Sequence, residues 1–334
     1  MKRKLTFLFA LLAALVSHSQ VSDFKHINFT IADNVAKLNE GASLKNLPVL
    51  AHELTYKLST DVEKFRAIYY WVSHNVIGDA QQEAKVNKSQ RTFKNDSLGF
   101  VNWNHEYKRT AFKKLVKHKK TVCTGYAYLI KELCFLANIE CEIVDGYGRN
   151  VSANVESLET INHSWNAVKL NGKWYLCDAT WSSGYFLGSL FVKDYNDGYF
   201  LTDPQLFSKN HFPVHKKWLL DNQLSEKEFV SSPLIYSEAF KYKLIPNNPN
   251  EMNIETKKND EVLFSFTTLD SLSNNKISLV KYIGTKEIPY KIYNIEETQG
   301  ITTFRCKFVQ KGFYDTHLKI NNDIVATYTV KVTK

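Results

Sequence analysis

The feature that most constrains the fold is a two-residue turn, Asn171-Gly172, between two runs of strand-forming residues. The first run is Ser164 to Leu170 and the second is Lys173 to Asp178. Asn-Gly favours a tight hairpin because both positions of such a turn need positive backbone φ angles. A turn of this length also fixes the strand register, so that Leu170 faces Lys173 and the pairing continues outward. The sequence therefore predicts an antiparallel hairpin of defined register.

This register brings a histidine close to a carboxylate. If the pairing continues to the ends of both runs, Trp165 faces Asp178 and His163 faces Thr180. Side chains alternate between the two faces of a strand, so all four residues project from the same face. His163 and Asp178 are then diagonal neighbours within reach of each other. A shift of one residue would put them on opposite faces, so the predicted pair depends on the turn.

Cys123 supplies the third part of an acyl-transfer site. It lies where a basic segment gives way to the apolar run 121–137, which is predicted to be a buried helix. The inner face of that helix is expected to carry Leu129, Leu133 and Leu136. Unpaired N–H groups and the dipole at a helix start favour a thiolate. The backbone N–H of Cys123 is also placed to hold an oxyanion.

We therefore predict a triad in which Cys123 is the nucleophile, His163 its base and Asp178 the group that orients the imidazole. The alternative is that all three residues are structural: a core thiol, a hydrogen-bonded histidine and a turn-forming aspartate. From the spacing alone, the two interpretations are about equally supported.

The same residues resemble known motifs. Thr121-Val-Cys-Thr-Gly-Tyr-Ala-Tyr-Leu resembles the cysteine motif of the transglutaminase-like superfamily. The stretch from His163 through the turn to Trp181 resembles the histidine and aspartate motifs of that superfamily, although Ala179 stands where members commonly have proline. Ile68-Tyr-Tyr-Trp-Val-Ser, Tyr199-Phe-Leu-Thr-Asp-Pro and His211-Phe-Pro resemble flanking segments of kyphoscoliosis-peptidase-like bacterial members. The resemblance covers about residues 45–230 and implies a papain-like α+β core with the triad named above.

The first twenty residues have the layout of a secretory signal peptide. Three basic residues precede the apolar run Phe7 to Val16, and a polar stretch with a cut after Ser19 follows. An uncleaved anchor is the alternative. Removal of the leader lowers the formal charge from +9 to +6, because Lys2, Arg3 and Lys4 lie in it. We therefore expect a secreted, periplasmic or cell-surface protein.

Three segments follow from the patterning along the chain: a signal peptide at 1–19, a transglutaminase-like domain with flanking helices at 20–232 and a β-sandwich at 235–334. Two helices are expected in the first part of the enzyme-like domain, Pro48 to Leu58 and one capped by Ser59-Thr60-Asp61. The polar stretch Asp79 to Asn95 is interpreted as a long surface loop or insertion. The last hundred residues alternate short β-branched runs with turn residues, as an antiparallel immunoglobulin-like sandwich does.

The remaining candidate residues are weaker. Trp165 could wall a substrate cleft or simply pack in the core, and Trp103 is a tentative cleft residue. The other four cysteines are Cys134, Cys141, Cys177 and Cys306. An odd number of cysteines leaves at least one free thiol, and a Cys134–Cys141 or Cys141–Cys177 disulfide stays open. No clustered spacing of ligands suggests a metal, no cofactor is expected, and no nucleic-acid motif accompanies the basic cluster Lys113 to Lys120.

Two functions remain open at this stage. The favoured one is an exported cysteine enzyme that acts on amides of a protein or peptide, including cell-wall peptide, with hydrolysis slightly preferred over transglutamination. The other is a silent binding or scaffold protein of the same fold at the cell surface. A Cys-His-Asp acetyltransferase is a third reading, and the absence of a nucleotide-binding motif makes it the weakest.

Overall fold

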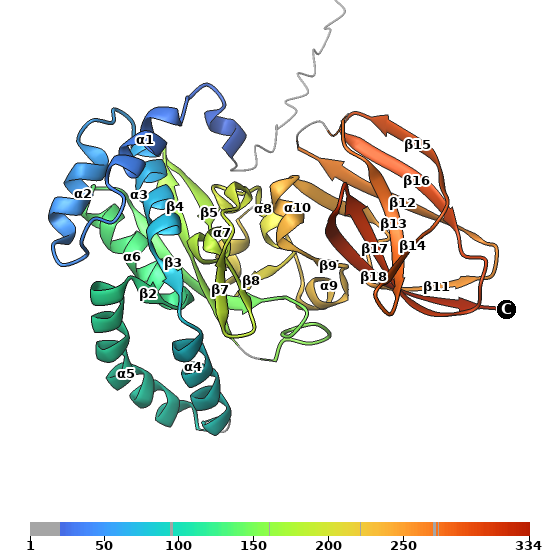
Figure 1. Cartoon of the computed structure of the whole chain (residues 1–334), viewed down its shortest axis with the longest axis horizontal. Coiled ribbons are helices and arrows are strands. Elements are labelled where there is room, and N and C mark those ends of the chain that lie inside the picture. The colour runs from blue at the N-terminus through green and yellow to red at the C-terminus, as the bar shows by residue number, and fades with distance from the viewer. Residues whose placement is uncertain (1–20, 94–95, 160, 221, 270–271, 273) are drawn as a thin grey trace, which may run out of the picture.

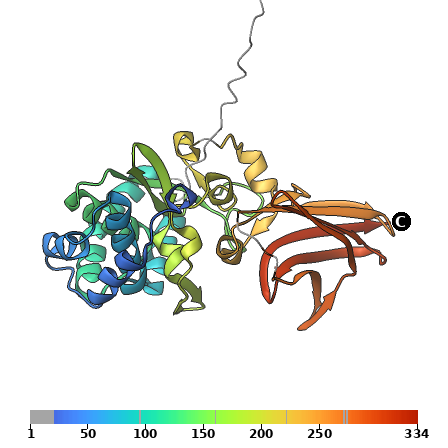
Figure 2. The same cartoon turned by 90° about the horizontal axis from the view of Figure 1, so that it is seen from above.

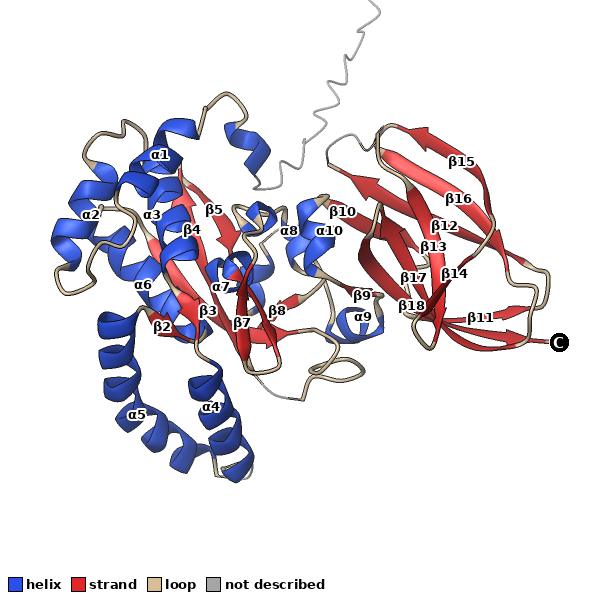
Figure 3. Ribbon diagram, viewed as in Figure 1, coloured by secondary structure: helices blue, strands red, loops and turns tan. Residues whose placement is uncertain are grey.

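The computed structural model describes residues 21–93, 96–159, 161–220, 222–269, 272 and 274–334. An α+β part and a C-terminal all-β part lie side by side (Figures 1 and 3). The view from above shows the same two parts along one long axis (Figure 2). The predicted signal peptide, residues 1–19, lies outside the described residues. No helix among the described residues is both long enough and apolar enough to span a bilayer.

The predicted hairpin forms the edge of the central sheet. Its four antiparallel strands lie in the order β5-β4-β3-β8. Their bounds are β3 Cys141–Gly148, β4 His163–Leu170, β5 Lys173–Cys177 and β8 His211–Pro213. Leu170 pairs with Lys173 and Asn166 with Cys177, so the predicted register is confirmed. Asn171 and Gly172 have φ angles of 50° and 80°, as the tight turn requires.

The predicted pairing fails at the far end of the hairpin. Strand β5 stops at Cys177, because the Asp178 side chain accepts hydrogen bonds from the backbone N–H groups of Thr180 and Trp181 and so starts helix α7 (Ala179–Ser183). The expected facing pairs Trp165–Asp178 and His163–Thr180 therefore do not form, and Thr180 lies on a helix. A cap aspartate directly after a strand favours this outcome.

Helix α6 (Cys123–Leu136) packs on the sheet and is covered in turn by α2 and α3. The helices around it are α1 Thr30–Leu38, α2 Leu47–Thr55 and α3 Asp61–Asn75, after a short 3-10 turn at Val21–Phe24. Thr60 and Glu63 form a reciprocal capping box at the start of α3, which confirms the predicted cap. Leu129 and Leu133 are buried as predicted. Leu136 is 39% exposed because it lies in the last turn of α6, so its predicted place on the inner face is wrong.

The stretch from Asp79 to Asn95, predicted as a long surface loop or insertion, belongs to an insertion between two short parallel strands and is largely helical. Helix α4 spans Ala80–Thr92 and α5 spans Ser97–His118, and the pair projects from the body of the molecule (Figure 1). Asp79 caps α4 by accepting a hydrogen bond from the N–H of Gln82. The loop prediction was wrong because α4 is polar on nearly all sides, so it lacks the apolar periodicity that identifies a packed helix. We call residues 80–118 the helical arm.

The arm is inserted between two short parallel strands, β1 (Ile77–Gly78) and β2 (Lys120–Thr121). After α7 come a small hairpin and short elements that close the α+β part. These are β6 Gly184–Leu187, β7 Leu190–Lys193, a 3-10 turn Asp197–Tyr199, α8 Pro204–Phe207, a 3-10 turn Lys216–Leu219 and α9 Glu226–Ser231.

The C-terminal part is a sandwich of two sheets, as predicted. One sheet has the order β10-β12-β16-β15 and the other β11-β18-β17-β13-β14, with β9 also paired to β18. The elements are β9 Leu234–Ile235, α10 Ser237–Lys241, β10 Leu244–Asn248, β11 Asn253–Lys257, β12 Glu261–Thr268, β13 Ile277–Ile283, β14 Lys286–Pro289, β15 Ile292–Thr298, β16 Ile301–Lys307, β17 Gly312–Ile320 and β18 Asp323–Thr333. Aromatic side chains such as Phe264, Phe304 and Tyr328 fill the space between the sheets.

The two faces of the central sheet contribute to different cores. Val168 and Leu170 pack toward the helices, whereas Trp165 and Ala167 belong to a cluster that continues through Phe240 into the sandwich. This division follows the alternation of side chains along β4. The sheet that carries the candidate site is therefore packed on both sides.

Candidate active site

Cys123 is the first residue of α6, at the end of the sheet where β4 begins. Val122, the residue before it, makes no side-chain cap, so the first turn of α6 offers its N–H groups to other partners. The Cys123 sulfur is partly exposed and lies 4.0 Å from the carbonyl oxygen of Asn162, the residue before His163. Farther along α6, the Asn166 amide donates to the carbonyl of Ala127 at 3.0 Å, which fixes α6 against β4.

A glycine allows the start of α6 to approach the strand before it. A Cβ atom placed on Gly125 would lie 1.9 Å from the hydroxyl oxygen of Thr121, a side chain that is only 1% exposed. Only glycine therefore fits at this position of the cysteine motif without moving its neighbour.

His163 and Asp178 are hydrogen-bonded at the heart of the site. The Nε2 atom of His163 lies 2.8 Å from Oδ2 of Asp178, and both side chains are buried. Because Nε2 faces the carboxylate, Nδ1 is the ring nitrogen left for another partner. The structure thus joins His163 directly to Asp178 and puts the Cys123 sulfur 4.0 Å from the carbonyl oxygen of Asn162, the residue before His163.

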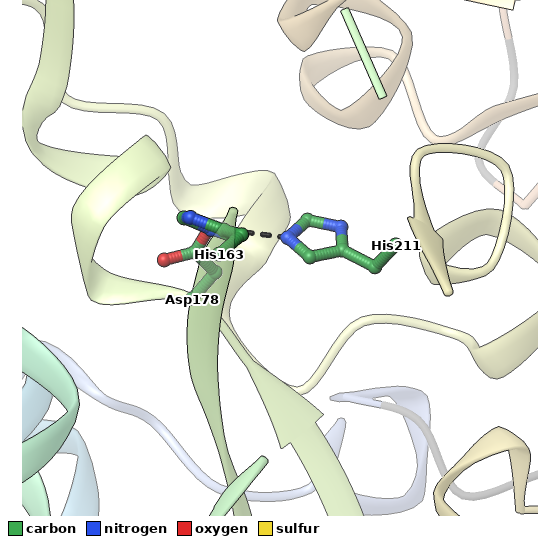
Figure 4. Close-up of side chains that lie close together, drawn as sticks. All are labelled: His163, Asp178 and His211. Carbon is green, nitrogen blue, oxygen red and sulfur yellow. Dashed lines mark hydrogen bonds and ion pairs between the residues drawn. The ribbon is translucent and has the colours of Figure 1, made fainter. Parts of the chain in front are cut away.

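The two carboxylate oxygens of Asp178 have separate partners. Oδ1 accepts the N–H groups of Thr180 at 2.8 Å and Trp181 at 3.3 Å, which caps α7. Oδ2 faces Nε2 of His163, and also Nε2 of His211 at 3.2 Å (Figure 4). The carboxylate is consequently held on both sides.

His211 is the site residue that sequence reasoning did not single out. It is the first residue of β8 and is 1% exposed. Gly146 of β3 permits the approach of β8, because a Cβ there would lie 2.3 Å from the carbonyl oxygen of Phe212. The only sequence signal was the His211-Phe-Pro segment, and nothing local connects that segment with Asp178, thirty-three residues earlier.

Charge and burial set the protonation states of these groups. Burial opposes the charge on His163, but the Asp178 carboxylate and the Cys123 sulfur outweigh it and raise the pKa of His163 to about 10. Burial likewise opposes the charge on Asp178, yet His163 and His211 hold the pKa of Asp178 well below its usual range. For His211 burial prevails over the Asp178 contact and lowers its pKa to about 4. At neutral pH the site therefore contains a charged His163–Asp178 pair and a neutral His211.

The tautomer of His211 follows from this neutrality. A carboxylate only accepts hydrogen bonds, so Nε2 of the neutral ring must carry the proton that faces Asp178. Nδ1 is then an acceptor, and it lies 2.7 Å from the side-chain amide of Asn210. The amide satisfies Nδ1 when its NH₂ group faces the ring, an orientation reached by a 180° rotation of the amide.

Aromatic rings enclose the histidines. Trp181 stacks on His163 with 4.6 Å between ring centroids, a contact that was not predicted. Trp165 is 1% exposed and packs against Phe207 and His211, so it lies beneath the site in the core. Trp103 lies on α5 of the helical arm, where it stacks on Tyr107.

The other four cysteines are free and buried. Neither of the two disulfides left open by the sequence, Cys134–Cys141 or Cys141–Cys177, is formed. Burial raises the pKa of Cys134 and Cys177 well above the ordinary thiol value, and that of Cys306 to about 12. Cys123 differs from all four in being partly exposed. It is therefore the cysteine best placed to react.

The three ligand atoms of His163, Asp178 and His211 lie within 4.8 Å of one another, close enough to bind one metal ion. Direct hydrogen bonds already join them, at 2.8 and 3.2 Å, and the three side chains are buried. A metal bound to Nε2 of His163 would replace the hydrogen bond between that nitrogen and the Asp178 carboxylate. The donor set thus suits hydrogen bonding within the protein better than ligation.

A family model matches the part of the sequence that carries the predicted triad. The model of the transglutaminase-like superfamily matches residues 48–179, a range that contains Cys123, His163 and Asp178. The chain carries a transglutaminase-like domain. Kyphoscoliosis peptidase of Homo sapiens is 32% identical to the chain over 215 residues, which are 63% of this chain and 30% of that protein. Hillarin of Drosophila melanogaster is 25% identical over 234 residues, 65% of this chain and 26% of that protein.

The chain thus spans less than a third of the length of these relatives. Among solved structures, the I81 domain of titin matches 28% of this chain and 98% of its own length, at 18% identity and a TM-score of 0.20. Beside the transglutaminase-like domain, the chain has an all-β part made of the two sheets described above.

Proposed function

We propose that this chain is an exported cysteine enzyme that transfers the acyl group of an amide through a thioester on Cys123. The observation that carries the proposal is the His163 ring, bonded through Nε2 to Asp178, with the Cys123 sulfur 4.0 Å from the carbonyl oxygen of Asn162, the residue before His163. A raised His163 pKa favours the imidazolium, which stabilises a neighbouring thiolate. At neutral pH, His163 is then an imidazolium and Asp178 a carboxylate, which are the charge states that the reaction needs.

The reaction has two halves. In the first, the Cys123 sulfur bonds to the carbonyl carbon, the carbon–nitrogen bond breaks, and His163 gives its proton to the leaving amine. The N–H groups at the start of α6 stabilise the oxyanion of the tetrahedral intermediate. In the second half, His163 takes a proton from the incoming nucleophile, which displaces the sulfur. Asp178 keeps the imidazole oriented and stabilises its charge throughout.

The nucleophile of the second half decides the product. Water gives a peptidase or amidase, and a primary amine gives a transglutaminase. We favour water, because it is always present and no acceptor site can be recognised from the sequence. The substrate class is a protein or peptide, with cell-wall peptide among the candidates because the leader directs the chain out of the cytoplasm.

The test compares the wild-type chain with Cys123→Ala on a denatured protein substrate. New amino termini would report hydrolysis, and incorporation of a fluorescent primary amine would report transfer. We expect hydrolysis that is lost in the variant while its circular dichroism and thermal midpoint are retained. Full activity of Cys123→Ala would refute the proposal. Absence of both activities in the wild type, together with a sluggish Cys123 thiol, would favour a binding or scaffold role.

Export is tested separately. The full chain, expressed in a Gram-negative host, should appear outside the cytoplasm as a protein that begins at Gln20. Intact-mass measurement distinguishes this product from a chain that retains Lys2, Arg3 and Lys4. A cytoplasmic protein of full length would contradict the export part of the proposal and leave the chemistry untouched.

A further inference from the structure

The helical arm contributes little to the core of the molecule. Of its described side chains, those that are buried are Gln82 and Leu115, both near its base. The arm nevertheless spans two helices that project into solvent (Figure 1). Ordering a segment of this length costs conformational entropy that burial does not offset here. Such an excursion in a compact domain points to a binding role.

The arm and the two lysines that follow it, Lys119 and Lys120, carry nearly all the net charge of the chain. Together, residues 80–120 contain eleven Lys and Arg against three Asp and Glu, a net charge of +8 in a chain whose total is +9. The rest of the chain, leader included, is therefore close to neutral. Concentration of one sign of charge on a protruding element creates a positive potential that attracts anions.

Most of these cations are free to meet a partner. The exposed ones are Lys85, Lys88, Arg91, Lys108, Arg109, Lys113, Lys117 and Lys120. Among the described residues, Lys114 is the arm cation that has a carboxylate within 4.0 Å, and that partner is the buried Asp79 at the base. The arm contains the acidic residues Glu83, Asp96 and Glu106, but none of them is within 4.0 Å of an arm cation in the part of the chain that the structure describes.

The arm is also attached next to the candidate nucleophile. Its base is the β1–β2 ladder, in which Gly78 pairs with Thr121, two residues before Cys123. On the other side, Gln90 of α4 donates to the carbonyl of Ile161 at 3.3 Å, two residues before His163. Glu83 of α4 is half-buried and close enough to feel the charge of His163. A molecule bound along the arm would therefore lie beside the site.

We infer that the helical arm binds an acidic segment of a polypeptide and so brings an amide of the same chain to Cys123. The inference rests on the proposed function and names its substrate class. A polypeptide is favoured over a membrane or a polysaccharide because the arm and an amide-cleaving site adjoin, and one peptide chain supplies both the anions and the amide. Arg109, Lys113 and Lys117 recur every four residues on α5, so they form one stripe along which such a segment could lie.

The test measures binding without turnover, in the full chain with Cys123→Ala. The probe is a fluorescent twenty-residue peptide of Glu, Gly and Leu, compared with the same peptide in which Gln replaces Glu. The arm variant is Arg109→Glu/Lys113→Glu/Lys117→Glu. The matched control is Lys286→Glu/Lys291→Glu/Lys311→Glu, which makes the same change of charge on exposed positions of the sandwich.

We expect the acidic peptide to bind the parent more tightly than the Gln peptide, with an affinity that falls as salt is raised. The arm variant should lose roughly tenfold or more in affinity, and the control less than about twofold, since each exposed charge contact contributes up to ~1 kcal/mol. Equal losses in the two variants would overturn the inference. So would an arm that binds heparin or anionic vesicles but not the acidic peptide. Because Cys123 is absent from the assay, failure of catalysis would leave this result unaffected.

Discussion

His211 and His163 meet at the same oxygen atom of Asp178, at 3.2 and 2.8 Å. The His163 ring is charged, because its pKa is raised, and the His211 ring is neutral and packs against Phe207. The neutral ring occupies the lone pair of Oδ2 that His163 does not use. We therefore regard His211 as a positioning residue that keeps the carboxylate directed at His163.

Replacement of His211 should slow the chemistry without unfolding the protein. In His211→Phe the ring can still pack against Phe207 and Trp165, but its hydrogen bond to Asp178 is lost. A hydrogen bond to a charged group contributes about 1.5–3 kcal/mol, so we expect roughly a 10- to 100-fold fall in kcat with KM little changed. Steady-state kinetics on a substrate that the hydrolysis assay shows to be cleaved would measure both.

The matched variant is His211→Gln, whose side-chain NH₂ can still donate toward Asp178. It should recover part of the lost kcat, and the pH profile of Cys123 alkylation should move toward that of the wild type. If Phe and Gln give the same profile as each other and as the wild type, His211 serves packing alone.

The stability of the protein should pass through a maximum near pH 6.5. The pKa of His211 is lowered to about 4 in the folded protein, against about 6.5 in the unfolded chain. His211 therefore costs no free energy of unfolding above pH 6.5, and the free energy of unfolding falls as the pH drops from 6.5 toward 4. The pKa of His163 is raised to about 10 in the folded protein. Its contribution to the free energy of unfolding is therefore fully present below pH 6.5 and is lost as the pH rises toward 10. At about 1.4 kcal/mol per pKa unit, the acid limb is on the order of 3 kcal/mol and the alkaline limb on the order of 5 kcal/mol.

Urea unfolding between pH 4 and pH 10 checks this expectation. His211→Phe should flatten the acid limb and leave the alkaline limb in place. An acid limb of the same steepness in both proteins would show that other groups determine it.

Asp178→Asn separates the charge of the carboxylate from its role as a helix cap. The amide oxygen can still accept the N–H groups of Thr180 and Trp181, so α7 should form. Loss of the negative charge leaves burial as the main influence on His163, and its pKa should fall from about 10 to below 6.5. We expect a 10³- to 10⁴-fold loss of kcat, by analogy with removal of the same charge in a serine triad.

NMR titration of the histidine rings would follow the pKa of His163 directly. Asp203→Asn is the control, since Asp203 caps α8 through the same kind of contact with the N–H of Gln205. A His163 pKa that stays near 10 in Asp178→Asn would mean that the carboxylate is not what holds the ring charged.

Gly125→Ala should destabilise the start of α6. The added methyl group would overlap the Thr121 hydroxyl, and overpacking of this kind costs about 1–3 kcal/mol. Combining it with Thr121→Ala should restore part of the stability, because the overlapping hydroxyl is gone. The two single variants and the double variant form a cycle in urea unfolding. If the losses in free energy of unfolding of the two single variants simply add up in the double variant, the overlap between residue 125 and the Thr121 hydroxyl is contradicted.

The turn and the cap of α3 were predictable because each depends on residues that are neighbours in sequence. Asn171-Gly172 determines its own φ angles, and the register of β4 with β5 follows from it. The meeting of His163 with Asp178 could be predicted for the same reason. Their contact survives even though Asp178 ends the strand, because the cap leaves Oδ2 turned toward His163.

The parts that were missed depend on tertiary packing. His211 reaches Asp178 only because β8 pairs with β3, and that pairing relies on the missing side chain of Gly146. Helix α4 has a cap but no apolar stripe, so its polar sequence reads as a loop. Trp181 stacks on His163 because α7 turns it back over the ring, a consequence of the cap at Asp178.

The central claim is that His163, held by Asp178, activates the thiol of Cys123, and the pH dependence of alkylation tests it most directly. Folded protein is treated with iodoacetamide between pH 4 and pH 9, and each cysteine peptide is quantified by mass spectrometry. Cys134, Cys177 and Cys306 are internal controls, since burial keeps their pKa values high. We predict that Cys123 is labelled at pH 7 while Cys134, Cys177 and Cys306 are not, and that His163→Ala slows the labelling of Cys123 at pH 7 at least about tenfold. Equal rates of Cys123 labelling at pH 7 in the wild type and in His163→Ala would contradict the account.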